Sequence, residues 1–254
     1  MSQDYKQIIQ REYLNCVKSP VHFMKKYCKI QHPTKGKIKF NLYDYQQEML
    51  TDFVDNRYNI ILKSRQLGIS TLSAGYSLWM MLFNQDKNIL VIAKDKDTAK
   101  NLVTKVRIMY ANLPQWLKTK VIEDNKLSLV FQNGSQIKAV AATAEAGRSE
   151  ALSLLVIDEA AFIDKIDSIW TAAQQTLATG GDCIALSTPN GVGNWFHQQW
   201  MGALDGTNNF NTIKLHWTCH PERDEAWRAE QDKVLGPSQA AQECDADFLT
   251  SGES

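Results

Sequence analysis

The stretch from Lys63 to Thr71 constrains the fold more than any other part of the sequence. A short apolar run, Ile60 to Leu62, comes directly before it, and an apolar segment with helical character, Leu72 to Phe83, follows it. A strand, a tight loop and a helix in that order form a cradle in which loop amides and the helix N-terminus bind an anion. The sequence therefore predicts an α/β fold with a phosphate loop at the end of a buried strand.

This loop departs from the usual pattern, G-x-x-x-x-G-K-[ST]. When Gly68 and Ser70 are aligned with that pattern, Lys63 stands at the first glycine position and Ile69 stands at the lysine position. The lysine has thus moved to the front of the loop. The residues that we predict to bind nucleotide here are Lys63, Ser64, Arg65, Gln66, Leu67, Gly68, Ile69, Ser70 and Thr71.

A second motif consists of an apolar run, Leu154 to Ile157, that ends in Asp158 and Glu159. A run that is apolar throughout suits a central parallel strand, because both faces of such a strand are buried. The carboxyl end of such a strand is where an open α/β sheet binds its ligand. Asp158 could hold Mg²⁺ directly or through water, and Glu159 could orient or deprotonate an attacking water. The alternative is a buried strand followed by a solvated turn, but the phosphate loop upstream favours the catalytic interpretation.

Composition places the chain among soluble globular proteins. Its 254 residues suffice for one large α/β domain or two small ones, and 44% hydrophobic and 22% charged residues are ordinary values. The formal net charge is zero, so any surface that binds nucleic acid has to be a local patch.

The cysteines indicate neither a disulfide framework nor a zinc site. They are Cys16, Cys28, Cys183, Cys219 and Cys244, and they form no C-x-x-C pair. His216, Cys219 and His220 lie close together but lack a second group of ligands. The N-terminus has no apolar signal core and no run is long enough to cross a membrane, so we expect a reducing cytoplasm.

Hydrophobic periodicity predicts the order of the other elements. Helices are expected over residues 3–18, 20–27, 97–110, 168–177, 194–201, 222–235 and 238–246, and a further helix begins at Tyr43. Strands are expected over residues 38–42, 88–93, 127–131, 136–141, 183–186 and 210–217. Asn133-Gly134 predicts a hairpin between two of these strands. Residues 1–42 are expected to form a helical lid or brace and residues 43–250 the core that carries the phosphate loop.

Three further groups of residues permit a functional and a structural interpretation. Tyr45 and Gln46 could contact adenine, since a ring stacks on a base and an amide pairs with its edge, or they could simply begin an amphipathic helix. Hydroxyls in the segment from Ser187 to Gly191 could sense the γ-phosphate, or the segment could be an ordinary turn. The basic residues Lys94, Lys96, Lys100, Lys105 and Arg107 could touch a DNA backbone, although such a run is usually a solvated helix face.

Five segments in a fixed order resemble one protein family. They are Tyr45-Gln46, Ser64 to Thr71, Gly147 to Ser149, Val156 to Ile163 and Ser187 to Gly191. Together they closely resemble the ATPase domain of the large terminase subunit of tailed bacteriophages, the motor that packages DNA into a preformed capsid. The T4-like branch is the most similar, and the resemblance covers about residues 20–250. It implies a P-loop NTPase of the ASCE, RecA-like class, with a mostly parallel sheet flanked by helices and a small N-terminal helical lid.

The resemblance also implies roles for individual residues. Tyr45 and Gln46 match the adenine-recognition motif, and Ser70 matches the hydroxyl on the Mg²⁺ side of the phosphate loop. Asp158 matches the metal carboxylate and Glu159 the catalytic carboxylate.

Four more residues match motifs that act during turnover. Ser187 and Thr188 match the coupling motif that links hydrolysis to movement. Arg65 and Arg148 match arginines proposed as fingers for the transition state, a role that suits a guanidinium because it neutralises charge on a transferring phosphoryl group.

Two features depart from the nearest relatives. Ile69 stands where they often have lysine, and we expect Lys63 to supply that ammonium by reaching back over the phosphates. Few residues follow Phe248, so the C-terminal nuclease of full-length family members is not expected in this sequence, and residues 251–254 are interpreted as a truncated linker.

The implied function is Mg²⁺-dependent ATP hydrolysis that drives double-stranded DNA into a procapsid. The implied partners are the DNA, the portal protein, the small terminase subunit and further copies in a ring, acting in the host cytoplasm and at the portal vertex, with no membrane. One alternative is a helicase or translocase like those of superfamily 2, which needs a second RecA-like domain. The other is a scaffold that binds ATP with little turnover, an idea motivated by Ile69.

Overall fold

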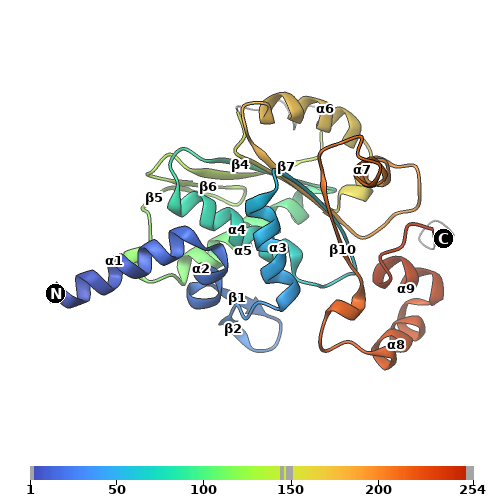
Figure 1. Cartoon of the computed structure of the whole chain (residues 1–254), viewed down its shortest axis with the longest axis horizontal. Helices are drawn as coiled ribbons and strands as arrows, with labels where there is room; N and C mark the ends of the chain where they lie inside the picture. Colours follow the sequence, from blue (N-terminus) through green and yellow to red (C-terminus); the bar gives the residue numbers. More distant parts are fainter. Residues whose placement is uncertain (1–2, 144–145, 147–150, 250–254) are drawn as a thin grey trace.

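The computed structural model describes residues 3–143, 146 and 151–249. An eight-stranded mixed sheet runs through the middle of the molecule, with helices on both faces (Figure 1). The order of its strands is β10-β3-β9-β8-β4-β7-β6-β5. They are β3 (Tyr58–Lys63), β4 (Asn88–Ala93), β5 (Val121–Asp124), β6 (Ser128–Phe131), β7 (Gln136–Ala141), β8 (Leu154–Asp158), β9 (Asp182–Ser187) and β10 (Asn211–Leu215). All neighbours from β10 to β7 pair in parallel, so the predicted mostly parallel sheet is confirmed.

The central strands are apolar throughout because both faces of the sheet are covered. In β3, Ile61 packs into the core on one face, while Ile60 and Leu62 pack into the core on the other. The same alternation holds in β8, where Val156 lies in the first core and Ile157 in the second. Burial on both faces is the reason that these strands lack the alternating pattern of a half-exposed sheet.

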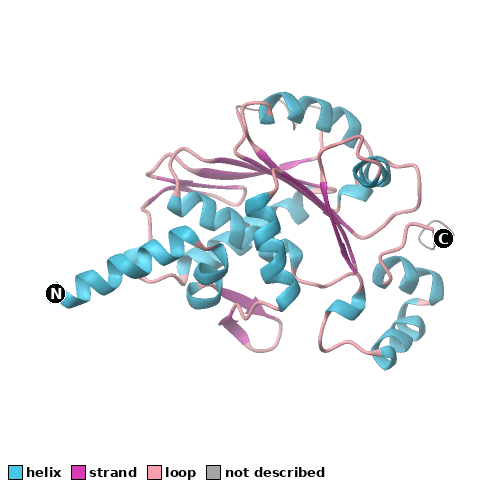
Figure 2. Cartoon of the chain, viewed as in Figure 1, coloured by secondary structure: helices cyan, strands magenta, loops and turns pink. Residues whose placement is uncertain are grey.

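Each core belongs to its own layer of helices. The first is covered by α3 (Asp44–Asp55), α4 (Ile69–Phe83) and α5 (Lys96–Ala111). The second is covered by α6 (Ile166–Leu177) and α7 (Trp195–Leu204), which lie on the other side of the sheet in Figure 2. Within the residues that the structure describes, three short 3₁₀ helices join longer elements: η1 (Gln115–Leu117), η2 (Ala160–Phe162) and η3 (Trp217–Cys219).

The N-terminal segment contains two helices and a hairpin. Helix α1 (Gln3–Lys18) extends away from the sheet (Figure 1), and α2 (Pro20–Tyr27) begins after Ser19, whose side chain accepts a hydrogen bond from the backbone of His22. These helices agree with the predicted ranges. The strand predicted over residues 38–42 is instead β2 (Gly36–Lys39), which begins and ends earlier and pairs with an unpredicted strand, β1 (Lys29–His32), in a separate antiparallel hairpin.

Polar edge strands account for most of the differences from prediction. β1, β2 and β5 carry exposed or partly exposed side chains and lack apolar alternation, so only their pairing reveals them. The predicted hairpin at Asn133-Gly134 is confirmed by the antiparallel pair of β6 and β7. The predicted strand over residues 210–217 ends earlier, since Trp217 begins η3.

The chain continues from β10 into two helices beside the edge of the sheet (Figure 1). They are α8 (Glu225–Leu235), which begins three residues later than predicted, and α9 (Pro237–Cys244). Arg228 of α8 holds the two together through a paired contact with Asp245, at 2.7 and 2.8 Å. No helix in the described ranges combines the length and the apolar character that a membrane span requires.

Candidate nucleotide-binding site

The predicted phosphate loop joins β3 to α4 at the carboxyl edge of the parallel strands. The backbone angle φ is +55° at Gln66 and +75° at Gly68, so the chain turns twice through the left-handed region. A methyl group at Gly68 would lie 2.8 Å from Nε2 of Gln46. Position 68 therefore requires glycine both for its backbone angle and for the space beside it.

A continuous row of backbone N–H groups, from Gln66 to Thr71, has no hydrogen-bond partner within the described residues. The later ones belong to the first turn of α4, where no partner exists inside a helix. The two preceding amides are engaged, since Ser64 donates to the carbonyl of Leu215 at 2.8 Å and Arg65 donates to that of Glu243 at 2.7 Å. Free amides grouped at a helix N-terminus are suited to bind an anion such as phosphate.

The side chains at the two unusual loop positions point to different surroundings. Ile69 is 2% exposed and packs into the core, so the position that usually carries lysine faces the interior. Lys63 is also buried, and its Nζ lies 3.9 Å from Oε1 of Glu159. The Lys63 ammonium therefore lies between the start of the loop and the acid pair. Its action on the phosphates of ATP stays a prediction.

Tyr45 and Gln46 both contact the phosphate loop. The Tyr45 hydroxyl and the Gln46 amide donate to the carbonyl of Leu67 at 2.9 and 3.0 Å, and Oε1 of Gln46 accepts from the backbone of Tyr43 at 3.1 Å. The structural interpretation, in which this helix packs one face on the core, is confirmed, because Tyr45 and Met49 are buried against the core. Adenine recognition by this pair stays a prediction, and in this structure both ends of the Gln46 amide are engaged within the protein.

A cavity of about 350 Å³ opens beside the loop. The ring of Tyr43 stacks on that of Tyr45, with 5.6 Å between centroids, and lies 4.6 Å from that of His220. The hairpin of β1 and β2 lines another side of the cavity, and Gln66 to Gly68 form the side next to the phosphate loop. An aromatic cavity adjoining an anion site has the size and surface that a nucleobase requires.

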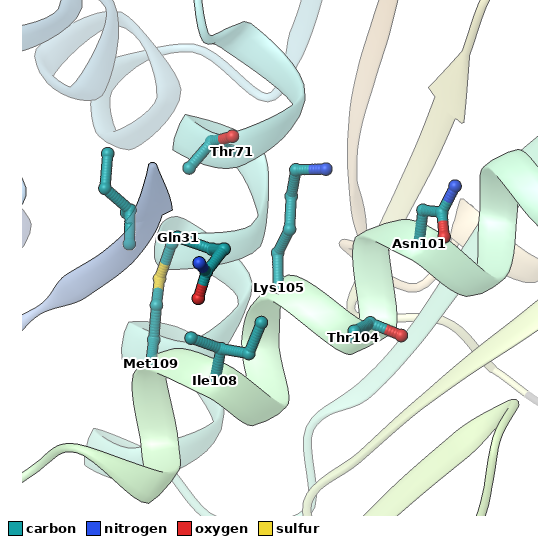
Figure 3. Close-up of a pocket in the computed structure, with 8 residues that line it drawn as sticks. Gln31, Thr71, Asn101, Thr104, Lys105, Ile108 and Met109 are labelled. Carbon is teal, nitrogen blue, oxygen red and sulfur yellow. The ribbon is translucent and has the colours of Figure 1, made fainter. Parts of the chain in front are cut away.

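A second cavity, of about 290 Å³, shares Ile30 and Thr71 with the first. Figure 3 shows Lys105 extending from α5 towards the turn of α4 that carries Thr71, with Gln31 of β1 beside it. Lys105 has no ion-pair partner in the described part of the chain. Lys105 of the predicted basic cluster therefore lines a cavity next to the end of the phosphate loop.

Asp158, at the end of β8, lies against the first turn of α4. Its Oδ2 accepts a hydrogen bond of 2.7 Å from the hydroxyl of Ser70, and its side chain is almost fully buried. A serine hydroxyl and a carboxylate are hard oxygen ligands, and Mg²⁺ typically combines one or two such groups with water and phosphate oxygens. No group of three or more His, Cys, Asp or Glu in the described ranges could hold a metal by itself. The pair therefore fits Mg²⁺ that arrives with a nucleotide.

Glu159 follows Asp158 in a left-handed conformation, with φ of +55°. Such an angle is uncommon for a residue other than glycine. Burial raises the pKa of its carboxyl above the ordinary value, Lys63 opposes that rise, and Asp158 adds to it. A carboxyl with a raised pKa next to Ser70 and Asp158 is suited to act as a general base.

The predicted coupling segment lies between the two motifs. β9 is hydrogen-bonded to β3 on one side and to β8 on the other. At its end, the buried hydroxyl of Ser187 accepts a 3.1 Å hydrogen bond from the backbone of Ala161, and Asn190 donates to the carbonyl of that residue. Thr188 is buried beside it. Ser187 thus contacts the turn that directly follows Glu159.

Of the two predicted arginine fingers, the structure describes Arg65. Arg148 lies outside the described residues. The guanidinium of Arg65 makes no hydrogen bond or ion pair with a described residue. In the basic cluster, Arg107 is partly buried and forms an ion pair with Asp124 at 2.6 Å, while contact of the cluster with DNA stays a prediction.

Sequence reasoning missed three residues that complete the site from the C-terminal segment. His220 lines the base cavity, Arg223 donates hydrogen bonds to the phosphate loop, and Gln242 donates to the carbonyl of Pro189 in the coupling segment. No local pattern marks any of them, because each acts on a segment far away in the sequence. Only the fold brings them together.

Comparison with known proteins identifies the family and supports the fold. A family model described as terminase large subunit, T4likevirus-type, N-terminal, matches residues 60–254. The large terminase ATPase domain of Thermus phage P74-26 is 22% identical, with a TM-score of 0.67 over 83% of this chain and 95% of that one. The HK97 bacteriophage large terminase is 18% identical, with a TM-score of 0.72 over 93% of this chain and 55% of that one.

A curated relative extends the comparison. The Mu-like prophage FluMu protein gp28 of Haemophilus influenzae is 23% identical in an alignment of 217 residues, and the match covers 74% of this chain. The chain spans 42% of the length of that relative. Because the family model matches most of its residues, the chain belongs to the terminase large subunit family, T4likevirus-type, and matches the N-terminal part of that family.

Proposed function

We propose that this chain binds ATP together with Mg²⁺ and hydrolyses its terminal phosphate bond. The observation that carries the proposal is the hydrogen bond between Ser70 and Asp158, with Glu159 next to it. It brings a metal-binding pair and a carboxyl of raised pKa to the end of a row of free amides. These are the groups that phosphoryl transfer requires, since its catalysis consists mostly of positioning and charge stabilisation.

In this proposal the phosphates bind the amides of residues 66–71 and the base enters the cavity between Tyr43 and His220. Large terminases of this fold from a thermophilic bacteriophage are known in complex with ADP and with ATP-γ-S, which supports a nucleotide as the ligand. Ser70 and Asp158 would hold Mg²⁺. The ion, when bound, neutralises charge on the phosphate oxygens.

Glu159 accepts a proton from the attacking water, or orients that water, at the end of β8. Lys63 lies 3.9 Å from its carboxylate and supplies positive charge that a bound phosphate can share. Arg65 and Arg148 are proposed to stabilise the charge of the transition state. Ser187 and Thr188 are proposed to transmit the loss of phosphate, which the contact of Ser187 with Ala161 supports.

Membership in the terminase family supports a motor that moves double-stranded DNA. The portal protein, the small terminase subunit and a ring of further copies are the proposed partners, on the strength of the family alone. No specific observation supports the competing helicase interpretation. The scaffold interpretation was motivated by the missing lysine at position 69, and it is weakened because Lys63 supplies a cation near the acid pair while Ile69 packs into the core.

The test is the steady-state ATPase rate against protein concentration, with and without Mg²⁺ and linear double-stranded DNA. Glu159→Gln should lower turnover about 10² to 10⁴-fold, whereas the matched variant Glu230→Gln, which changes an exposed glutamate of α8, should leave it intact. Arg148→Ala should lower the rate more at high concentration if neighbouring subunits complete the site. A rate at background for the wild-type protein, despite measurable ATP binding, would favour the scaffold.

A further inference from the structure

Arg223 holds three consecutive residues of the phosphate loop from outside. It precedes α8 and is far from the loop in sequence. Its Nη1 donates to the hydroxyl of Ser64 at 3.2 Å and to the carbonyl of Arg65 at 3.0 Å. Its Nη2 donates to the carbonyl of Gln66 at 3.0 Å. A planar guanidinium fork is suited to this, because it offers several donors in fixed directions.

The start of α8 holds Arg223 in place. The side chain of Asp224 caps the helix by accepting a 2.8 Å hydrogen bond from the backbone of Trp227. The Trp227 ring in turn lies 4.3 Å from the centre of the Arg223 guanidinium, in a cation–π contact. No carboxylate of the described residues forms an ion pair with Arg223, so its positive charge next to the phosphate loop is not neutralised by a salt bridge.

These hydrogen bonds decide which way the loop amides point. The described peptide bonds are trans, and in a planar trans peptide the carbonyl and the following N–H point in opposite directions. The carbonyls of Arg65 and Gln66 face Arg223, so the N–H groups of Gln66 and Leu67 face away from it. The carbonyl of Leu67, held by Tyr45, has the same effect on the N–H of Gly68. The free amides therefore point away from the groups that hold the carbonyls.

We propose that Arg223 is a positioning residue for nucleotide binding, which keeps the amides of the phosphate loop directed at the nucleotide phosphates. This inference rests on the proposed binding of ATP by the loop. The same short segment contributes His220 and Glu222 to the base cavity. Arg223 thus fixes the phosphate loop relative to one wall of the cavity for the base.

Two readouts test this proposal, and one of them needs no nucleotide. The amides of Ser64 and Arg65 are hydrogen-bonded to Leu215 and Glu243, so their hydrogen–deuterium exchange reports whether the loop stays in place. Arg223→Ala should speed that exchange about tenfold and leave β4 and β8 unchanged. It should also weaken binding of a fluorescent ADP about tenfold, and Arg223→Lys should lie between the two because an ammonium lacks the fork.

Arg107→Ala is the matched control. It removes an arginine that is held by Asp124 of β5, at the opposite edge of the sheet. Neither loop exchange nor ADP affinity should change in this variant.

Unchanged exchange at Ser64 and Arg65 in Arg223→Ala would overturn the proposal, as would faster exchange spread equally over β4 and β8. Faster loop exchange with unchanged ADP affinity would also overturn it, because the loop position would then be irrelevant to binding. If the wild-type protein binds no nucleotide, yet Arg223→Ala still frees the loop, the contact is upheld and the proposed ATPase function fails.

Discussion

The substitution Gly68→Ala tests how rigidly the phosphate loop is packed. Two costs are expected. An alanine at φ of +75° costs about 1 to 2 kcal/mol. Its methyl group would also lie 2.8 Å from Nε2 of Gln46, which is buried and donates to the carbonyl of Leu67. Displacing that amide leaves a buried hydrogen bond unmade, at about 1 to 3 kcal/mol.

Gly206→Ala separates these costs. Its φ of +73° is nearly the same, but a methyl group there meets nothing within 4 Å. Urea unfolding should therefore show Gly68→Ala to be less stable than Gly206→Ala by about 1 to 3 kcal/mol. In a Gln46→Ala background this excess should disappear. Equal losses for the two glycines in the wild-type background would refute the argument that Gln46 is fixed against the loop.

Three further outcomes are expected. Lys63→Ala should lower the ATPase rate about tenfold or more with little loss of folding, and a wild-type rate would exclude Lys63 as the replacement cation. In Glu159→Gln, turnover should fall about 10² to 10⁴-fold while ADP affinity is retained. For the wild-type protein, kcat/KM should fall on acidification, and it should do so at a higher pH than for an ordinary glutamate base because the pKa of Glu159 is raised. Burial raises the pKa of Asp182 from 3.8 to about 6, so its carboxyl binds a proton more tightly in the folded than in the unfolded state. The contribution of this group to the free energy of unfolding should therefore fall by about 1 to 3 kcal/mol as pH rises from about 4 to about 6. Asp182→Asn should remove that slope in urea unfolding measured across the same pH range.

The parts of the fold that were predicted correctly are those in which a short sequence pattern is compatible with a single local structure. A strand buried on both faces, such as β8, is apolar along its whole length, and Ser19 before Pro20 has the side chain and spacing of a helix cap. The same applies to the acid pair, because the end of such a strand is the edge at which ligands bind.

What the sequence could not predict depends on partners that are far apart along the chain. β1 and β2 are polar strands that become visible only when they pair with each other. Arg223 resembles any other arginine before a helix until the fold places it against Ser64 and Gln66. Two of its three hydrogen bonds are to backbone carbonyls, and a carbonyl gives no sequence signal about which residue will approach it.

The register of β9 explains how two separate motifs become one site. Its residues pair with β3 so that Leu62 lies opposite Ser187, and with β8 so that Asp158 lies opposite Leu186. The ends of three strands are thereby level, and the Ser187 hydroxyl reaches the turn after Glu159. Because side chains alternate between faces, a slip of one residue would turn Ser187 away from that turn and move the apolar side chains of β9 into the opposite core. The packing that stabilises the sheet is therefore also what sets the distance between the phosphate loop and the acid pair.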